Sequence, residues 1–488
     1  MASSRTRRKL AVVVLAAGKG KRMKSALPKV LHPVAGRPSL WHVLQAARAA
    51  RPDVLVIVAG HGAEEVEQAV RGWNIKPPPV FVVQHQLLGT GHATAAAEQV
   101  TEGAQDVVVL AGDDPLIAAG HVRTLLGTHR RTKAAATILT TVVDDPTGYG
   151  RVVREGSELK DIVQEADASP EQRRIREVST LAYAFRREDL YGALPLVGRE
   201  NRLREYYLPD VLFILRNKGE RLSAVPVDLG GALGLNSRAG LAAVNRVMRD
   251  RIVKAHMAAG VTFADPSTSF VDVDVRIGPD TVILPLTFLE GATRIGRDCS
   301  IGPATRVVDS TVADGARITF AVVHGSKIGR HATVGPYASL RPGTVLEDGA
   351  KVGTYVEVKA SRVGKGSKVP HLAYVGDAVI GEGSNLGAGT VTVNYDGFEK
   401  HRTVIGDGVH VGSDTMLVAP VRLGANSWTG AGSVITKDVP PGALAVERTE
   451  QRTIAGYDER RREARKKDAG ARGRATRTTS KRSRRGSD

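Results

Sequence analysis

The chain has 488 residues, of which 42% are hydrophobic and 25% charged, so it can bury at least two ordinary cores and is not disordered throughout. Its single cysteine, Cys299, excludes an internal disulfide framework, and no Cys/His cluster has zinc-type spacing, so we expect a reducing compartment, the cytoplasm. The formal net charge of +18 would suit a polyanionic partner, but the charge is unevenly placed and gathers in a C-terminal tail.

The N-terminal segment MASSRTRRKL is basic and leads into an apolar run over residues 11–17. That run is shorter than a membrane span and has no cleavage-type boundary after it, so we predict a buried first strand. No other stretch of the sequence is long and apolar enough to cross a bilayer. We therefore expect a soluble protein without a membrane span.

The first half of the chain alternates apolar runs with amphipathic stretches, the pattern of a mostly parallel sheet covered by helices. The predicted strands are residues 10–16, 54–59, 80–83, 107–111 and 136–143, and the predicted helices include residues 39–50 and 91–100. Ligands of such sheets bind beyond the carboxyl ends of the strands. The residues just after Ala16 and Ala111 are therefore the first candidates for a site.

A glycine-rich turn follows the first predicted strand, in the sequence Leu15-Ala16-Ala17-Gly18-Lys19-Gly20-Lys21-Arg22-Met23. It is not a Walker A loop, which ends in Gly-Lys-Ser/Thr, nor a dinucleotide fingerprint, because Met23 stands in place of the third glycine. Backbone amides of such a turn can approach phosphate oxygens, and Lys19, Arg22 and Lys29 add positive charge. On these residues alone, the loop is either a phosphate site or an ordinary basic turn.

From about residue 265 aliphatic residues recur every six positions, with small or turn residues between them. They form three phased runs: Ile277, Ile283, Leu289, Ile295, Ile301, Val307; Ile328, Val334, Leu340, Leu346, Val352, Val358; and Ile405, Val411, Leu417, Leu423. A six-residue period is that of a parallel β-solenoid. Residues 236–260 carry apolar side chains at helical spacing and are predicted to form a connecting helix.

Four motifs in a fixed order extend the glycine-rich turn into a larger pattern. They are LAAGKGKRM with Pro28-Lys29-Val30-Leu31, Gln84 with Leu88-Gly89-Thr90-Gly91-His92-Ala93, Ala111-Gly112-Asp113, and Gly148-Tyr149-Gly150-Arg151. Together they resemble the sugar-nucleotide pyrophosphorylases, and most closely the bifunctional family of N-acetylglucosamine-1-phosphate uridylyltransferase and glucosamine-1-phosphate N-acetyltransferase. The resemblance extends to about Arg452.

The resemblance implies an α/β fold, with a Rossmann-like nucleotidyltransferase domain followed by a left-handed parallel β-helix of hexapeptide repeats. The expected organisation is a basic extension (1–9), a uridylyltransferase domain (10–235), a linker helix (236–264), an acetyltransferase domain (265–452) and a basic tail (453–488). Such an enzyme makes UDP-N-acetylglucosamine, a precursor of the cell envelope and its peptidoglycan, from glucosamine-1-phosphate, acetyl-CoA and UTP. The resemblance also implies a homotrimer, although nothing in the sequence fixes the number three.

In the first domain the resemblance assigns Gln84 to the uracil edge, and Gly89 and Thr90 to the wall of the nucleotide pocket. The residues expected to bind the nucleotide and the sugar are Leu15, Ala16, Ala17, Gly18, Lys29, Gln84, Gly89, Thr90, Gly150, Gln164, Ser179 and Asn236.

The resemblance places Mg²⁺ between Asp113 and Asn236. One carboxylate and one amide are sufficient, because Mg²⁺ keeps its other positions for water and phosphate. In the expected reaction N-acetylglucosamine-1-phosphate attacks the α-phosphate of UTP and pyrophosphate leaves. Arg22 and Lys29 would stabilise the charge of that transition state.

Two positions depart from the family pattern in the sugar pocket. Gln164 stands where the family has an acidic residue, and Ser179 stands where it has an asparagine. Gln can hydrogen-bond a hydroxyl without the charge assistance of a carboxylate, and Ser is shorter than Asn. Glu165 could replace the missing carboxylate only if the strand register slips by one residue, which would turn it to the opposite face. A different sugar preference, or activity in only one half, is the alternative reading.

Polar side chains interrupt the six-residue period between residues 341 and 400. Acylation of an amine needs a base to take the amine proton, and recognition of a phosphate needs cations. His371 supplies the first, and Arg341, Lys359 and Lys400 supply the second. A single histidine is more often structural, but the family resemblance makes His371 the general base, oriented through Glu357.

The remaining residues of the second site come from the resemblance alone. Glucosamine-1-phosphate would be bound by Arg341, Lys359, Tyr374, Asn385 and Lys400. Acetyl-CoA would be bound by Ala388, Asn394, Tyr395, Ser413, Ala431 and Arg448. Cys299 lies several repeats earlier and is not expected to carry an acyl group.

The tail after residue 453 is rich in Arg and Lys among Gly, Ser and Thr, and it has no apolar periodicity. We therefore predict a disordered tail. It is either a solvated extension or a weak, salt-sensitive binder of polyanions, in which case the protein could be tethered to nucleic acid or to an anionic membrane.

Overall fold

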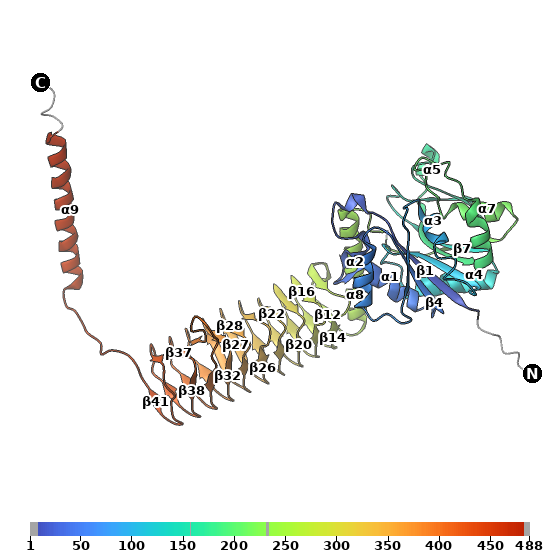
Figure 1. Ribbon diagram of the computed structural model, residues 1–488. Helices are drawn as coiled ribbons and strands as arrows, with labels where there is room; N and C mark the ends of the chain where they lie inside the picture. Colours follow the sequence, from blue (N-terminus) through green and yellow to red (C-terminus); the bar gives the residue numbers. More distant parts are fainter. Residues whose placement is uncertain (1–7, 157, 231–233, 483–488) are drawn as a thin grey trace, which may run out of the picture.

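The computed structural model describes residues 8–156, 158–230 and 234–482. Figure 1 shows an α/β domain at one end, a long solenoid, and a helix that stands apart beyond the solenoid. The described residues begin at the α/β domain and end with that last helix. The molecule is therefore elongated, with its two folded parts arranged end to end.

A nine-stranded sheet forms the centre of the first domain, in the order β11-β7-β10-β6-β1-β4-β5, with β8 and β9 forming a hairpin beside β10. The strands are β1 (Leu10–Ala16), β4 (Val54–Ala59), β5 (Val80–Val83), β6 (Asp106–Ala111), β7 (Ala136–Val142), β8 (Arg151–Glu155), β9 (Glu158–Val163), β10 (Glu177–Arg186) and β11 (Leu222–Pro226). β10 is antiparallel to β6 and β7, whereas β1 is parallel to both of its neighbours. The five expected strands are confirmed. The apolar runs of β1, β4 and β6 are buried on both faces of the sheet, whereas β5 lies at its edge with Val80 and Val83 exposed.

Helices cover both faces of this sheet. They are α1 (Ser39–Arg48), α2 (Ala63–Arg71), α3 (Thr90–Ala95), α4 (Ala119–Thr132), α5 (Pro170–Arg173), α6 (Arg187–Ala193) and α7 (Asp210–Asn217). Val12 packs in one core cluster and Val13 in the other, because successive side chains of a strand point to opposite faces. The helix expected over residues 91–100 is shorter than predicted, since the chain after Ala95 continues in hydrogen-bonded turns.

The connecting helix α8 (Arg238–Ala258) joins the two folded parts. Its N-terminus is capped by Ser237, whose Oγ accepts the Gly240 amide at 3.1 Å. The Asn245 side chain accepts the Ala35 amide at 3.0 Å, and Arg37 of the first domain pairs with Asp274 at the start of the solenoid. These contacts tie the solenoid to the first domain through side chains on both sides of the junction.

The solenoid consists of three parallel sheets of 11, 10 and 9 short strands, from β12 (Thr262–Phe263) to β41 (Leu444–Ala445). Strands of one sheet recur every third element, so each coil contributes one strand to each face. The predicted aliphatics are stacked in register, as with Ile283, Ile301 and Ile318, and they fill one continuous core. The six-residue period therefore reports inward-facing side chains.

One corner of the solenoid exposes large side chains, which we call the corner ladder: Leu286, Phe320, Tyr337, Tyr355 and Leu372. Each residue has a left-handed backbone, with φ between 43° and 58°. The rings of Phe320 and Tyr337 are 5.4 Å apart and those of Tyr337 and Tyr355 are 5.3 Å apart. The exposed fractions run from 38% to 63%, which is unusual for stacked apolar side chains on a monomer.

The prediction of a disordered tail is wrong for most of its length, because the structure has the helix α9 (Tyr457–Arg482) there. Arg, Lys, Ala and Glu favour helix, and Asp458 and Glu459 lie in the first turn, where negative charge is stabilised. An ion pair at 2.7 Å joins Asp458 to Arg462 one turn later. Residues 483–488 of the predicted tail and residues 1–7 of the predicted extension lie outside the described residues.

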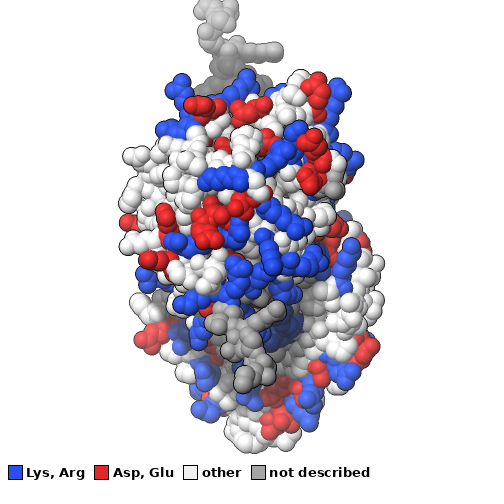
Figure 2. Space-filling view, turned by 90° about the vertical axis from the view of Figure 1, so that its right-hand side faces the viewer, with Lys and Arg blue, Asp and Glu red and all other residues white. Residues whose placement is uncertain are grey.

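Charge on the outer end of the first domain is mixed in sign. Figure 2 shows Lys and Arg across the middle of this face, with Asp and Glu interspersed around them. Within residues 8–156, 158–230 and 234–482, no helix is long and apolar enough to cross a membrane.

Candidate active sites

A cavity of about 860 Å³ opens at the carboxyl ends of β1 and β6. These ends meet because Leu15 pairs with Ala111, and the Gly112 amide donates to the Leu15 carbonyl at 2.8 Å. The structure brings these predicted residues together in the lining: Leu15, Ala17, Gly18, Lys19, Arg22, Lys29, Gln84, Gly89, Thr90, Asp113, Gly150, Gln164, Ser179 and Asn236. Ala16 instead packs in the core beneath the cavity.

The glycine-rich turn owes its shape to a short 3-10 helix, η1 (Lys21–Met23). Gly20 has φ 56°, and a Cβ there would lie 2.7 Å from Cβ of Lys29, so only glycine fits. Met23 is 1% exposed and anchors the turn, which explains why this position is not the third glycine of a dinucleotide loop. Lys19 and Arg22 remain at the rim of the cavity.

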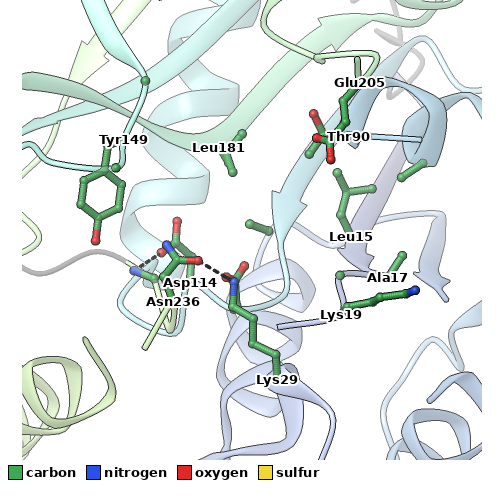
Figure 3. Close-up of a pocket in the computed structure, with 18 of the residues that line it drawn as sticks. Leu15, Ala17, Lys19, Lys29, Thr90, Asp114, Tyr149, Leu181, Glu205 and Asn236 are labelled. Atoms are coloured by element: carbon green, nitrogen blue, oxygen red, sulfur yellow. Dashed lines mark hydrogen bonds and ion pairs between the residues drawn. The ribbon is translucent and has the colours of Figure 1, made fainter. Parts of the chain in front are cut away.

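Lys29 lies between the two expected metal ligands. Its Nζ donates to Oδ1 of Asn236 at 2.8 Å and forms an ion pair with Oδ2 of Asp113. Figure 3 shows the lysine reaching toward Asn236 across the floor of the cavity. A carboxylate oxygen and an amide oxygen thus converge on one cationic group, a donor set that also suits Mg²⁺.

Asp114 also lines the cavity, although the sequence did not single it out. Its Oδ1 accepts the Gly234 amide at 2.8 Å, which closes the turn that carries Asn236. Burial and the neighbouring Asp113 charge raise the pKa of Asp114 to about 8. In the described ranges no group of three or more His, Cys, Asp or Glu is arranged to hold a metal ion.

The end of the cavity expected to bind the sugar is formed by β10, the turn before β8 and the segment after β9. The Gln164 amide lies against Gly150, since a Cβ on Gly150 would be 3.1 Å from its Nε2. The Ser179 hydroxyl is 3.0 Å from the buried Tyr183 hydroxyl, so it is occupied within the protein. Neither side chain brings a negative charge to this end of the cavity.

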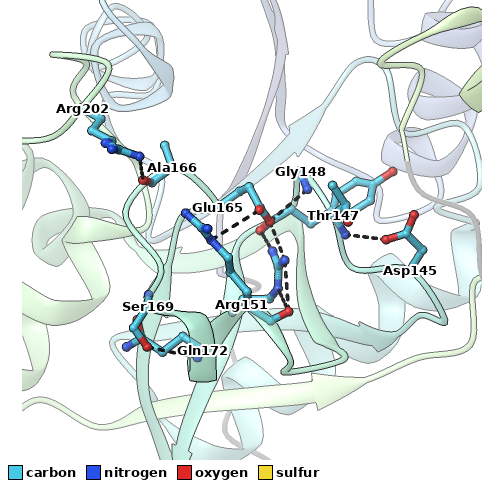
Figure 4. Close-up of polar contacts among 11 residues, drawn as sticks. Asp145, Thr147, Gly148, Arg151, Glu165, Ala166, Ser169, Gln172 and Arg202 are labelled. Atoms are coloured by element: carbon cyan, nitrogen blue, oxygen red, sulfur yellow. Dashed lines mark hydrogen bonds and ion pairs between the residues drawn. The ribbon is translucent and has the colours of Figure 1, made fainter.

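Glu165 does not replace the missing carboxylate. It pairs with the buried Arg151 and accepts the Gly148 amide at 3.1 Å (Figure 4). Arg151 also donates to the carbonyl of Tyr149, so this pair fixes the turn that carries Gly150. Successive residues of a strand point to opposite faces, so Glu165 is expected to point away from the face of Gln164, and its pairing with Arg151 agrees with this expectation.

Leu181 is a further lining residue that sequence reasoning missed. Its φ is 51°, in the irregular part of β10 between Ser179 and Tyr183, and its side chain faces the cavity (Figure 3). A leucine in the left-handed region is strained, and such strain often occurs at functional sites. No periodicity in the sequence marks this position.

In the solenoid, the expected acceptor site is a cluster of charged pairs on neighbouring coils. Nη1 of Arg341 donates to Oε1 of Glu357 at 2.9 Å, and Nζ of Lys359 donates to Oδ2 of Asp377 at 3.2 Å. A hydrogen bond with Lys359, together with its positive charge, lowers the pKa of Lys400. Cations this close together suit a phosphate group.

His371 ends β30 (Lys368–His371) and is exposed, directly before Leu372 of the corner ladder. Its backbone pairs in parallel register with Thr354 of the preceding coil. Glu357 pairs with Arg341, and among the described residues no hydrogen bond joins Glu357 to His371, so the orientation of His371 through Glu357 stays a prediction. Tyr374 lies beside Glu357 in register, and Asn385 lies beside Lys368 on the next coil.

Backbone contacts link several of the residues expected to bind acetyl-CoA to the next coil of the solenoid. The Ala388 carbonyl accepts from Asp414, the Ser413 carbonyl accepts from Gly432, and Nη1 of Arg448 donates to the Ala431 carbonyl at 3.0 Å. Asn394 is buried, and its Nδ2 donates to Asp377 at 2.5 Å. Tyr395 belongs to a loop that leaves the coil between β34 (Val391–Val393) and β35 (Thr403–Ile405).

Known proteins match both folded parts. The family model of the MobA-like NTP transferase domain matches residues 12–181, and that of the hexapeptide repeat of succinyl-transferase matches residues 402–437, in keeping with the expected left-handed β-helix. The bifunctional protein GlmU of Syntrophomonas wolfei is 46% identical over 449 residues, covering 91% of this chain and 99% of that protein. Those of Streptomyces avermitilis and Mycobacterium sp. (strain KMS) are 48% and 50% identical, each over 93% of this chain and over 95% and 92% of their own lengths.

Proposed function

Since the chain belongs to the family of bifunctional GlmU proteins, it makes UDP-N-acetylglucosamine in two steps, and we propose that the two candidate sites divide these steps between them. The solenoid site acetylates glucosamine-1-phosphate with acetyl-CoA, and the cavity of the first domain joins the product to UTP. The observation that carries this division is the convergence of Lys29, Asp113 and Asn236 beside the glycine-rich turn. The proposed uridylyltransferase domain is residues 10–235, and the proposed acetyltransferase domain is residues 265–452. UTP and acetyl-CoA as substrates suit a cytoplasmic enzyme.

In the uridylyl step, an oxygen of the sugar phosphate forms a bond to the α-phosphorus of UTP. The bond from that phosphorus to the bridging oxygen breaks, and pyrophosphate leaves with the electron pair. Arg22 and Lys29 neutralise charge that builds on the phosphates, while the amides after Ala17 cradle them. Gln84, Gly89 and Thr90 bind the base at the other wall of the cavity.

Asp113 and Asn236 are proposed to hold Mg²⁺. The fit rests on their oxygens, which converge on the Lys29 ammonium and would accept a metal ion beside it. When bound, Mg²⁺ neutralises phosphate charge and orients the leaving pyrophosphate. Lys29 would then turn its ammonium toward the phosphates.

In the acetyl step, the amine of glucosamine-1-phosphate attacks the thioester carbon of acetyl-CoA. The carbon–sulfur bond breaks, the sulfur takes up the proton that the amine loses, and coenzyme A leaves as its thiol. His371 takes the amine proton, and the cations Arg341, Lys359 and Lys400 bind the phosphate. Ala388, Asn394, Tyr395, Ser413, Ala431 and Arg448 bind acetyl-CoA along the solenoid.

We propose a homotrimer that buries the corner ladder. Tyr337 is 54% exposed, Tyr355 60% and Leu372 63%, and their apolar surface needs a partner. Leu372 directly follows His371, so a second copy packed on the ladder would reach the acetyl site. Closed cyclic symmetry would bury the ladder of every copy.

Separate assays of the two half-reactions test this proposal. His371→Ala should abolish acetyl transfer and spare uridylyl transfer, and Asp113→Ala should do the reverse. Loss of both activities in either variant would contradict the division into two sites. Light scattering of wild type and Tyr355→Asp measures whether the ladder mediates assembly.

A further inference from the structure

The Gln84 side chain is held by two acceptors on the same segment of chain. It follows β5 and is 5% exposed. Its Nε2 lies 3.2 Å from the Gly89 carbonyl oxygen and 2.9 Å from Nδ1 of His92. Its position in the chain is fixed as well, because its backbone amide donates to the Ala59 carbonyl at 2.7 Å.

These contacts settle the roles of both side chains. A carbonyl oxygen can only accept, so the NH₂ group of Gln84 is the end that faces Gly89. The same NH₂ group faces His92, so Nδ1 must offer a lone pair and the imidazole proton must sit on Nε2. Both hydrogens of the amide are then used, and Gln84 presents only its Oε1 acceptor to other partners.

The imidazole of His92 is itself held in place. It lies on α3, whose start is bound by the Gly91 amide donating to the Tyr206 carbonyl at 2.8 Å. The rings of His92 and Tyr206 stack at 6.3 Å, and the Arg199 guanidinium covers Tyr206 at 5.3 Å. His92 and Tyr206 line a second cavity of about 360 Å³, so the imidazole borders a hollow rather than lying in a packed core.

We propose that His92 is a positioning residue that orients the Gln84 amide and thereby sets the preference of the cavity for uracil over cytosine. The inference rests on the proposed assignment of this cavity to UTP. Uracil carries a hydrogen on N3, which a fixed Oε1 can accept. Cytosine carries a lone pair on N3, which the same oxygen repels. An amide free to rotate would offer its NH₂ group to cytosine and lose the distinction.

Two substitutions separate the hydrogen bond from the packing. His92→Phe keeps a ring that can stack on Tyr206 but removes the acceptor. His92→Asn loses the ring but can place Oδ1 where Nδ1 lies. We would measure kcat and KM for UTP and for CTP with N-acetylglucosamine-1-phosphate, using the full chain, with acetyl transfer in the same samples as the control for folding.

The expected result is a loss of about fivefold to tenfold in the UTP to CTP ratio of kcat/KM for His92→Phe, the size of one neutral hydrogen bond. The loss should appear mainly in KM for UTP, and His92→Asn should restore most of the ratio. If Asn lowers the ratio and Phe keeps it, ring packing explains the role of His92 and the inference is overturned. An unchanged ratio in both variants also overturns it. A wild-type chain that transfers no uridylyl group would instead refute the proposed function.

Discussion

The pair between Arg151 and Glu165 gives the sharpest test of how the sugar end of the cavity is built. Arg151 is 1% exposed, so its guanidinium depends on protein partners for its charge. Glu165→Ala removes the only carboxylate paired with Arg151 among the described residues and also releases the Gly148 amide. The matched control is Glu158→Ala, an exposed carboxylate on the same hairpin.

Breaking a buried pair from one side costs about 3 to 5 kcal/mol. Glu165 is 32% exposed, so water screens this pair. We therefore expect Glu165→Ala to lower the free energy of unfolding by a smaller amount, about 2 kcal/mol. Because Arg151 also holds the Tyr149 carbonyl, the turn with Gly150 should loosen. KM for N-acetylglucosamine-1-phosphate should then rise by about tenfold, since poor positioning weakens binding.

Urea unfolding of the first domain can be followed by the fluorescence of Trp41 and Trp73 in a Trp428→Phe background. Glu165→Gln keeps an acceptor without the charge and should fall between wild type and Glu165→Ala. Acetyl transfer should stay at the wild-type level in all variants. Wild-type stability and KM in Glu165→Ala would refute the reasoning.

Three further predictions concern other parts of the chain. Burial lowers the pKa of His129 from 6.5 to about 4, so below pH 6.5 the unfolded chain takes up a proton that the folded chain resists. The free energy of unfolding of the first domain should therefore fall by about 3 kcal/mol between pH 6.5 and pH 4. Urea titrations should show that this free energy depends less on pH in His129→Gln. Leu181→Gly should cost less than about 1 kcal/mol in thermal unfolding, because relief of the left-handed leucine offsets lost packing; a loss above about 2 kcal/mol contradicts this strain. A chain ending at Gly456 should keep both activities but lose any salt-sensitive binding to duplex nucleic acid, measured by fluorescence anisotropy; if either activity disappears, α9 has a catalytic role.

The fold could be predicted from the sequence where one local signal repeats. The apolar runs of β1 and β4 are long enough for a strand buried on both faces, and the six-residue period marks the inward side chains of the solenoid. The prediction for the tail was wrong because no such signal repeats there. Its composition lacks an apolar face, which predicts no packing, but its residues still favour a helix by themselves.

The site could be predicted only where residues lie close in the chain. The turn around Gly20 and the motif with Asp113 were found because each follows a strand. The contact of Lys29 with Asn236 joins residues 207 positions apart, and the strained φ of Leu181 leaves no trace in composition. Such features depend on tertiary packing, which overrides local preference.

On the proposed division of the two sites, the end-to-end arrangement of the two folded parts separates the two reactions in space (Figure 1). From β12 to β30 the chain climbs six coils of one sheet, on the order of 30 Å at the usual strand spacing, before it reaches His371. We expect a product formed beside His371 to leave the solenoid before it reaches the first cavity. It enters the surrounding solution, where it mixes with every other molecule of its kind. The two halves of the enzyme are therefore coupled by concentration, and unlabelled N-acetylglucosamine-1-phosphate added from outside should dilute a label carried from glucosamine-1-phosphate.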